Sequence, residues 1–120
     1  MKRRILLLLA TPDSASLSRA LADEIATAAA EEGAETRLID LYAEGFDPVL
    51  TAEEAQRRFS FDPVVQAQQQ AVQEADLVVW VHPDWWGGMP ALMKGWLDRV
   101  LQPGFAFSFE EDSDGRFRRW

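Results

Sequence analysis

The 120-residue sequence contains no cysteine, which excludes disulfide bonds, thiolate metal sites and cysteine nucleophiles. It also lacks an excess of basic residues. The formal net charge is −8, and this disfavours general binding to nucleic acids or anionic membranes. No apolar run is long enough to span a bilayer, and residues 5–10, which follow three basic side chains, are too short for the core of a signal peptide. We therefore expect a cytoplasmic protein with neither nucleic acid nor membrane as a partner.

What is present is a pattern of alternating strands and helices. At 48% apolar and 27% charged residues, the composition is typical of a folded chain, and we take residues 1–120 as one domain. In chain order, strands are predicted at residues 4–10, 35–41 and 76–81, and helices at residues 17–32, 51–59, 62–75 and 90–101. This alternation predicts the α/β class with a parallel sheet. Residues 104–120 differ, and predict a short β-hairpin or two extended arms.

Helical periodicity also predicts one apolar face for each main helix. In the first helix the periodic positions are Leu17, Ala20, Leu21, Ile25, Ala28 and Ala29. In the third they are Val64, Gln68, Ala71, Val72 and Ala75. The last helix has a buried stripe made of Met89, Leu92, Met93, Trp96, Leu97, Val100 and Leu101.

Two loops follow the carboxyl ends of predicted strands, where open α/β sheets bind their ligands. The first, residues 11–18, carries the hydroxyl groups of Thr11, Ser14, Ser16 and Ser18. The N-terminus of the helix that follows offers free amides and the positive end of the helix dipole, so it can bind phosphate. Such residues are also common caps of helices that bind nothing, so this loop alone is a weak indication. Neither a GxGxxG sequence nor a P-loop occurs.

The second loop contains Trp85-Trp86-Gly87-Gly88. Two indoles at a strand end expose a large apolar surface unless something flat covers them. The adjacent glycines let the backbone approach a ligand closely, and an isoalloxazine ring has the matching form of a planar apolar body with a hydrogen-bonding rim. The alternative is that one or both indoles pack under the next helix or against a partner subunit. We favour a ligand role for Trp86, while for Trp85 both interpretations stay open.

Other polar residues near this loop are less informative. His82 is the only histidine and could donate a proton, but it could equally be a packing or hydrogen-bonding residue, so we assign no catalytic residue. Asp84 could contact a ligand or cap the turn. The acidic residues at 110–114 are interpreted as a solvated turn, and no cluster of histidine, aspartate and glutamate has metal-ligand spacing. No metal site is predicted.

Residues 82–100, HPDWWGGMPALMKGWLDRV, resemble the NAD(P)H:quinone oxidoreductases of flavodoxin-like fold. That family typically shows a proline, an aromatic pair, a glycine, a spaced Pro-Ala and then Lys-Gly-Trp. The likeness continues through residues 103–107, PGFAF, and includes residues 40–42 and 46–50 after the second strand. The first loop is similar to the family's phosphate loop. The resemblance spans nearly the whole chain.

The resemblance implies a flavodoxin-like three-layer sandwich that lacks the last two strands of the family. It also implies an enzyme that transfers two electrons from NAD(P)H to a quinone or similar acceptor through bound FMN or FAD. The implied cofactor-binding residues are Thr11, Ser16, Leu17 and Ser18 at the phosphate, and Pro83, Asp84, Trp85, Trp86 and Gly87 along the isoalloxazine.

The sequence departs from the family in two respects. Thr11 stands where the family often has a histidine, which weakens the case for the pyrophosphate of FAD more than for the single phosphate of FMN. The family also continues through a fourth strand, a glycine-rich flavin loop with a tyrosine, and a fifth strand with its helix. Without them the strand at residues 77–81 becomes a bare apolar sheet edge, which invites pairing with another chain. We therefore expect a homodimer, strand exchange between chains, or poor solubility.

Two other functions are compatible with the fold class. A non-catalytic truncated or accessory domain would keep the half-fold and act through protein association. A receiver domain of the response-regulator type shares the fold but needs an acidic pair after the first strand, where this chain has Ala10-Thr11-Pro12. We set the receiver aside and keep the accessory domain as the alternative to the enzyme.

Overall fold

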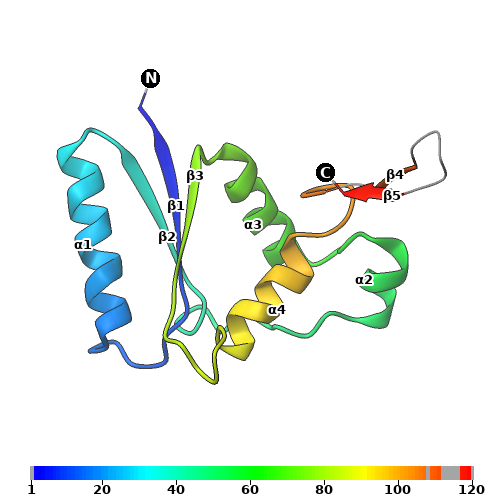
Figure 1. Cartoon of the computed structure of the whole chain (residues 1–120), viewed down its shortest axis with the longest axis horizontal. Helices are drawn as coiled ribbons and strands as arrows, with labels where there is room; N and C mark the ends of the chain where they lie inside the picture. The colour runs from blue at the N-terminus through cyan, green and yellow to red at the C-terminus, as the bar shows by residue number, and fades with distance from the viewer. Residues whose placement is uncertain (1, 108, 112–116, 120) are drawn as a thin grey trace.

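The structure is a computed structural model that describes residues 2–107, 109–111 and 117–119. Strands and helices alternate through the first hundred residues (Figure 1). In chain order they are β1 (Arg4–Leu9), α1 (Leu17–Glu31), β2 (Glu35–Asp40), α2 (Ala52–Arg57), α3 (Pro63–Glu74), β3 (Leu77–Val81), α4 (Ala91–Val100), β4 (Phe109–Glu111) and β5 (Phe117–Arg119). Within the described residues, no helix is long and apolar enough to cross a bilayer.

The main sheet has three parallel strands in the order β2-β1-β3, so the predicted α/β class with a parallel sheet is confirmed. β1 lies in the centre because its aliphatic run is buried on both faces, and Leu8 and Leu9 have no exposed surface. Leu9 is in register with Asp40 on one side and with Val81 on the other. The strand order reverses at β1, which makes the carboxyl ends of β1 and β3 the switch point of the sheet.

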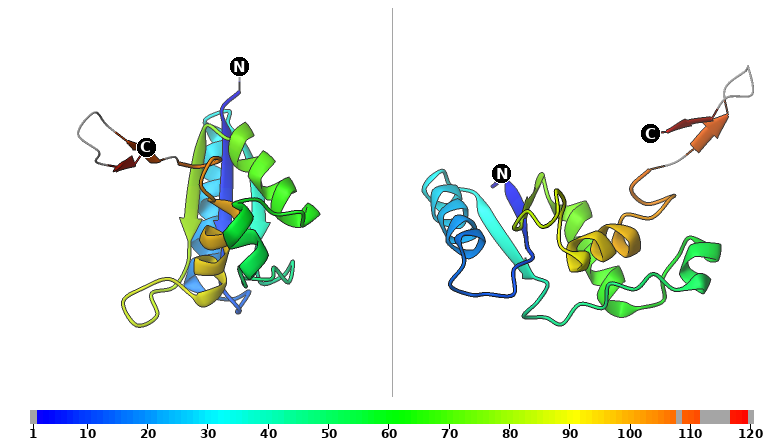
Figure 2. Two further views of the ribbon diagram at one scale, coloured as in Figure 1. Left: turned by 90° about the vertical axis from the view of Figure 1, so that its right-hand side faces the viewer. Right: turned by 60° about the horizontal axis from the view of Figure 1, so that its bottom comes forward.

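Helices cover both faces of this sheet, and alternate residues of β1 serve the two sides. Leu7 and Leu9 face α1, where they pack with Ala22. Leu6 and Leu8 face α3 and α4 and belong to the larger core cluster, which includes the fully buried Trp96 of α4. Figure 2 shows α1 on one side of the sheet and α3 with α4 on the other.

The buried faces of two helices differ from the periodicity-based prediction. In α1 the large residues Leu17 and Leu21 are exposed, at 75% and 48%, whereas Ser18 and Ala22 are buried. The helix is rich in alanine on several sides, so its apolar pattern is weak, and small residues on the inner face let it approach the sheet closely. In α3, Val65 is fully buried and the predicted Val64 is 51% exposed, because tertiary packing places the neighbouring valine on the inner face.

The chain's end forms a separate two-stranded antiparallel sheet, in which β4 pairs with β5. This confirms the predicted hairpin, although the turn at residues 112–116 lies outside the described residues. Helix caps also follow the sequence. Thr51 and Glu54 form a reciprocal capping box at α2, and Asp62 caps α3. These local signals fix where the helices begin.

Candidate functional site

The two unusual loops begin side by side at the switch point of the sheet. The amide of Ala10, just past β1, donates to the carbonyl of Val81 at 3.0 Å. Both chain segments then leave the sheet at the same end (Figure 1). The structure thus brings the hydroxyl-rich loop and the tryptophan loop to one edge, where ligands of such sheets bind.

The first loop satisfies much of its own hydrogen-bonding capacity. Ser16 is the N-cap of α1, and its Oγ accepts from the amide of Arg19 at 3.2 Å. The hydroxyls of Thr11 and Ser16 are hydrogen-bonded at 3.0 Å, and Thr11 is buried at 7% exposure. Asp13 Oδ1 accepts from the amide of Ala15 at 2.8 Å. These bonds hold the loop in one shape without a ligand.

This loop also offers backbone amides as donors. The amides of Leu17 and Ser18 open α1 and have no intrahelical acceptor by the geometry of the helix. The side chain of Leu17 is exposed, whereas Ser18 is buried against the protein. The chemistry available here is that of a helix N-terminus, which favours an anionic group.

A basic side chain beside this helix end was not identified from the sequence. Arg19 Nη1 lies 3.2 Å from Asp40 Oδ2, at the carboxyl end of β2, and its Nε lies 3.3 Å from Asp23. Two carboxylates therefore hold the guanidinium in the first turn of α1. Its position two residues after Leu17 is visible in the sequence, but its two carboxylate partners, which offset its charge, are not.

The second loop is a tight hairpin turn. Trp85 and Gly88 exchange two backbone hydrogen bonds, Trp85 N to Gly88 O at 2.9 Å and Gly88 N to Trp85 O at 3.2 Å. The two residues between them, Trp86 and Gly87, both have positive φ angles, of 58° and 75°. This is the pattern of a type I′ turn, which suits Gly87 but imposes a left-handed conformation on a bulky residue at Trp86.

The turn presents its aromatic side chains to solvent. Trp86 is fully exposed, at 106%, and Trp85 is 43% exposed, so neither indole lies in the core of the protein. The flanking Asp84 is exposed and Pro83 is half-buried. A strained backbone that displays a large apolar ring is a costly arrangement, and such arrangements concentrate at ligand-binding sites.

His82 lies between β3 and this turn. Its Nδ1 is 2.8 Å from the carbonyl oxygen of Pro83, and since a carbonyl only accepts, the ring donates this bond. The half-buried ring thus has a local structural role through Nδ1. This geometry fits the hydrogen-bonding interpretation of His82 and provides no catalytic assignment.

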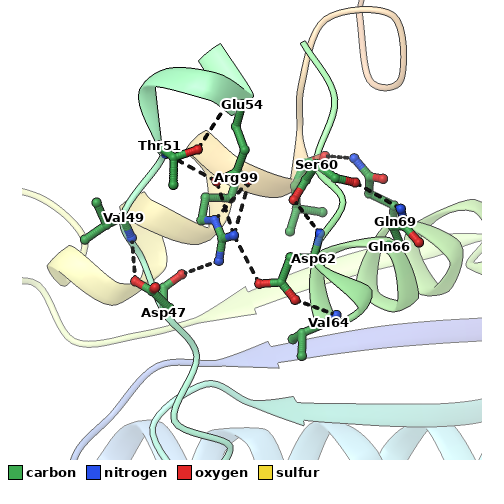
Figure 3. Close-up of polar contacts among 11 residues, drawn as sticks. Asp47, Val49, Thr51, Glu54, Ser60, Asp62, Val64, Gln66, Gln69 and Arg99 are labelled. Carbon is green, nitrogen blue, oxygen red and sulfur yellow. Dashed lines mark hydrogen bonds and ion pairs between the residues drawn. The ribbon is translucent and has the colours of Figure 1, made fainter. Parts of the chain in front are cut away.

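A second polar cluster lies away from the loops, around Arg99 of α4 (Figure 3). Arg99 is buried, and its Nη2 is 3.2 Å from Glu54 Oε2 and 3.1 Å from Asp62 Oδ2. Its Nη1 donates to the carbonyl oxygen of Asp47 at 2.9 Å, and the guanidinium lies over the ring of Phe46. Glu54 and Asp62 also act at the starts of α2 and α3, and nothing in the sequence indicates that one arginine joins them.

Electrostatics in this cluster favours the ionised forms. Burial opposes ionisation of Glu54, but hydrogen bonds from Ser60, Thr51 and Arg99 outweigh it and hold its pKa below the ordinary value of 4.5. Burial likewise opposes the charge on Arg99, yet its hydrogen bonds to Glu54 and Asp62 raise its pKa. The cluster fastens the segment around α2 to α4.

Gly95 explains why α4 can lie so close to that segment. A β-carbon at this position would be 2.2 Å from Pro48 Cβ and 2.3 Å from the carbonyl oxygen of Pro48. Only glycine fits between the helix and the loop. The glycine of the Lys-Gly-Trp sequence therefore serves packing, and the tryptophan beside it donates a hydrogen bond to buried Gln68.

Comparisons with known proteins agree with this architecture. A protein-family model described as "Flavodoxin-like fold" matches residues 3–119. An "Uncharacterized NAD(P)H oxidoreductase" of Haemophilus influenzae is 39% identical over 108 residues, which cover 88% of this chain and 54% of that protein. "NAD(P)H dehydrogenase [quinone] 1" of Cavia porcellus is 30% identical over 126 residues, which cover 89% of this chain and 46% of that protein.

Solved structures give the same result. An NAD(P)H:quinone oxidoreductase from Methanothermobacter marburgensis superposes with a TM-score of 0.82 at 26% identity, covering 91% of this chain and 57% of that one. A putative quinone reductase from Klebsiella pneumoniae superposes with a TM-score of 0.83 at 30% identity, covering 94% and 51%. The chain thus spans about half the length of the relatives that it matches.

Proposed function

Because the chain belongs to the family of flavodoxin-like fold, we propose that it acts in a flavin-dependent NAD(P)H:quinone, or related acceptor, oxidoreductase. The proposal rests on one observation, the strained turn that holds Trp86 in solvent beside the carboxyl ends of β1 and β3. The names of the relatives supply the reaction class, since they are NAD(P)H oxidoreductases and quinone dehydrogenases.

The residues present fit a flavin. The turn offers a flat apolar indole and, at its tip, the amides of Trp86 and Gly87, which take no part in the two bonds that close it. The first loop offers the amides of Leu17 and Ser18 at a helix N-terminus, where an anion is favoured. A flavin has an apolar ring with a polar rim and a phosphate tail. It therefore needs an apolar surface and an anion-binding surface at the same edge of the sheet.

We assign the ring to the second loop and the phosphate to the first. Pro83, Asp84, Trp85, Trp86 and Gly87 would line the isoalloxazine, with Trp86 covering its apolar face. Thr11, Ser16, Leu17 and Ser18 would hold the phosphate, the first two by fixing the loop through their mutual hydrogen bond and the last two through their amides. A bound flavin would supply two-electron hydride transfer between NAD(P)H and the acceptor.

The finer parts of the proposal concern cofactor and assembly. Either FMN or FAD is compatible with the loops, with Thr11 favouring the single phosphate of FMN. We also propose that the chain forms a homodimer, that residues 1–120 act as one flavodoxin-like domain, and that the protein is cytoplasmic.

A direct test is titration of the purified 120-residue chain with FMN and with FAD, followed by absorbance and by quenching of tryptophan fluorescence. The chain has five tryptophans, so Trp86→Phe and Trp96→Phe variants should be titrated alongside it. We expect saturable quenching that depends on Trp86 and not on buried Trp96. Oxidation of NAD(P)H by a soluble quinone, measured with the flavin present, then tests turnover. A chain that binds neither flavin contradicts the proposal.

The alternative is a non-catalytic domain that keeps the half-fold for protein association. The observation in its favour is that the chain spans about half of each relative. It predicts stable association, no flavin binding and no turnover. The same titration separates the two functions.

A further inference from the structure

One side chain joins the start of α1 to the end of β2. Arg19 Nη1 lies 3.2 Å from Oδ2 of Asp40, the last residue of β2, and its Nε lies 3.3 Å from Oδ1 of Asp23. The side chain of Asp23 is 64% exposed, whereas those of Arg19 and Asp40 are 33% and 21% exposed. Partly buried ion pairs are screened less by water and salt than exposed ones. The bond to Asp40 is therefore the stronger constraint on this arginine.

Asp40 is itself a fixed point. Its second carboxylate oxygen, Oδ1, accepts from the amide of Ala43 in the turn after β2 at 3.1 Å. Its backbone is in register with Leu9 of β1, and the amide of the next residue, Leu41, donates to the carbonyl of Leu9 at 2.9 Å. One carboxylate thus contacts both the turn after β2 and the first turn of α1. These contacts lie at the end of the sheet where the loop after β1 begins (Figure 1).

The backbone of Arg19 is held from the other side. Arg19 is the third residue of α1, and its amide donates to the Oγ of the N-cap Ser16 at 3.2 Å. Ser16 is hydrogen-bonded in turn to Thr11, which lies two residues after β1. Between Ser16 and Arg19 lie only Leu17 and Ser18, whose amides we assign to the flavin phosphate. The two amides therefore lie between an attachment to the loop after β1 and an attachment to β2.

We propose that Arg19 is a positioning residue for the flavin phosphate, which acts through Asp40 to fix the direction of the Leu17 and Ser18 amides. The inference deepens the proposed function and rests on it. Donors that are fixed in place before an anion arrives lose little freedom when it binds, so affinity is gained without any new contact. The charge of Arg19 is offset by Asp23 and Asp40, which leaves geometry, rather than attraction at a distance, as its contribution.

The opposite role, in which Arg19 binds the phosphate directly, predicts an effect of opposite sign. The phosphate then competes with the carboxylate partner for the guanidinium, so Asp40→Asn would free Arg19 and tighten FMN binding. An arginine that positions the helix needs that partner, so Asp40→Asn should weaken FMN binding. Asparagine has nearly the size of aspartate, and the substitution removes the charge with little change in packing.

The test compares FMN with riboflavin, which has the same ring but no phosphate. Each is titrated into the purified chain and its variants, and tryptophan fluorescence gives the dissociation constants. Arg19→Met keeps the length of the side chain and should weaken FMN binding by roughly fivefold, the equivalent of one partly exposed ion pair. Binding of riboflavin should be unchanged, because it has no phosphate to contact the amides. Circular dichroism establishes that every variant is folded.

Further variants separate this role from nearby alternatives. Asp40→Asn should weaken FMN binding as Arg19→Met does, and the double variant should lose no more than Arg19→Met alone, because the two residues act as a pair. Asp23→Asn removes the exposed partner and should have a smaller effect. Arg57→Met is the matched control, since Arg57 also forms an i, i+4 pair, with Glu53 on α2, and it should change neither affinity.

The outcomes distinguish the inference from the function it rests on. A loss specific to FMN in Arg19→Met and Asp40→Asn, without further loss in the double variant, supports the positioning role. Tighter FMN binding by Asp40→Asn, equal losses for FMN and riboflavin, or normal FMN binding by Arg19→Met each overturns it, while flavin binding by the unmodified chain still supports the proposed function.

The unmodified chain alone tests the premises. If it binds riboflavin as tightly as FMN, the assignment of the phosphate to the first loop is wrong, and the role of Arg19 is overturned with it. If it binds neither, the proposed function and this inference are both contradicted.

Discussion

The cluster around Arg99 and the turn at Trp86 are both unusual, but they differ in how their cost is offset. Arg99 is a buried charge whose guanidinium contacts two carboxylates, a carbonyl and an aromatic ring. Trp86 has a left-handed backbone and an indole that lies in solvent. The first arrangement is complete within the protein, and for the second we propose that a ligand covers the ring. This difference separates structural residues from candidate binding residues better than burial or polarity does alone.

The largest expected effect is on the Arg99 cluster. Arg99→Ala should lower the free energy of unfolding by about 3–5 kcal/mol, because it leaves the Glu54 carboxylate buried without its partner. Urea denaturation measures the loss. Lys94→Ala is the matched control on the same helix, since its ion pair with Asp98 is exposed and is worth roughly 0.5 kcal/mol. Equal effects of the two substitutions would show that the cluster is not a structural anchor.

The charge of Glu54 should account for part of this stability. Glu54→Gln should cost roughly 1.5–3 kcal/mol at neutral pH, the range of hydrogen bonds to charged groups. The folded state lowers the pKa of Glu54, so its contribution is present above the ordinary value of 4.5 and is lost as the pH falls through the lowered pKa. Urea midpoints of both proteins, measured from pH 7 to pH 3, should therefore converge at the acidic end. A constant difference across that range would contradict the ionised assignment.

The turn should behave in the opposite way. Trp86→Ala should weaken flavin binding by roughly tenfold, because a stacked aromatic contact is lost, with little change in the free energy of unfolding. Fluorescence titration and urea denaturation of the same protein give both values. Trp86→Asn provides a further comparison, since asparagine tolerates a positive φ and should keep the turn without the ring. A Trp86→Ala protein that unfolds easily but binds flavin normally would reverse the assignment.

The smallest effect is expected at the first loop. Ser16→Ala removes the cap of α1 and should cost about 1 kcal/mol of stability. Its effect on flavin binding should be smaller than that of Trp86→Ala, since the Ser16 hydroxyl already accepts from Arg19 and is hydrogen-bonded to Thr11. Thermal denaturation and the same titration compare the two. A loss of binding larger than that of Trp86→Ala would make the hydroxyls, rather than the amides, the phosphate ligands.

Local signals in the sequence were sufficient to predict the elements. The strand predicted at residues 4–10 is β1, and the helix predicted from residue 51 is α2, which begins at Ala52 after its Thr51 cap. The position of the two loops could also be predicted, because the carboxyl ends of neighbouring parallel strands meet at one edge of the sheet. Which side of each helix is buried was harder to predict. Leu17 and Val64 fitted helical periodicity but are exposed, since tertiary packing chose the smaller or neighbouring residue instead.

Interactions between distant segments could not be read from the sequence. Arg99 and Glu54 are 45 residues apart, and nothing local distinguishes this arginine from an exposed one. The conformation of the second loop was also hidden, because the two-residue turn places tryptophan at a position where sequence rules expect asparagine, aspartate or glycine. The residues whose conformation departs from local turn preferences were therefore the hardest to predict from the sequence.

The position of β1 also determines when the sheet can be assembled. Its residues are synthesised before those of β3, yet Ile5 is in register with Leu77, and the amide of Arg4 donates to Asp76 across 72 positions of chain. Until those later residues have left the ribosome, one side of this apolar strand has no neighbour, so it stays open to mistaken pairings during that interval. Any shorter product that ends before β3 would carry that unpaired side permanently.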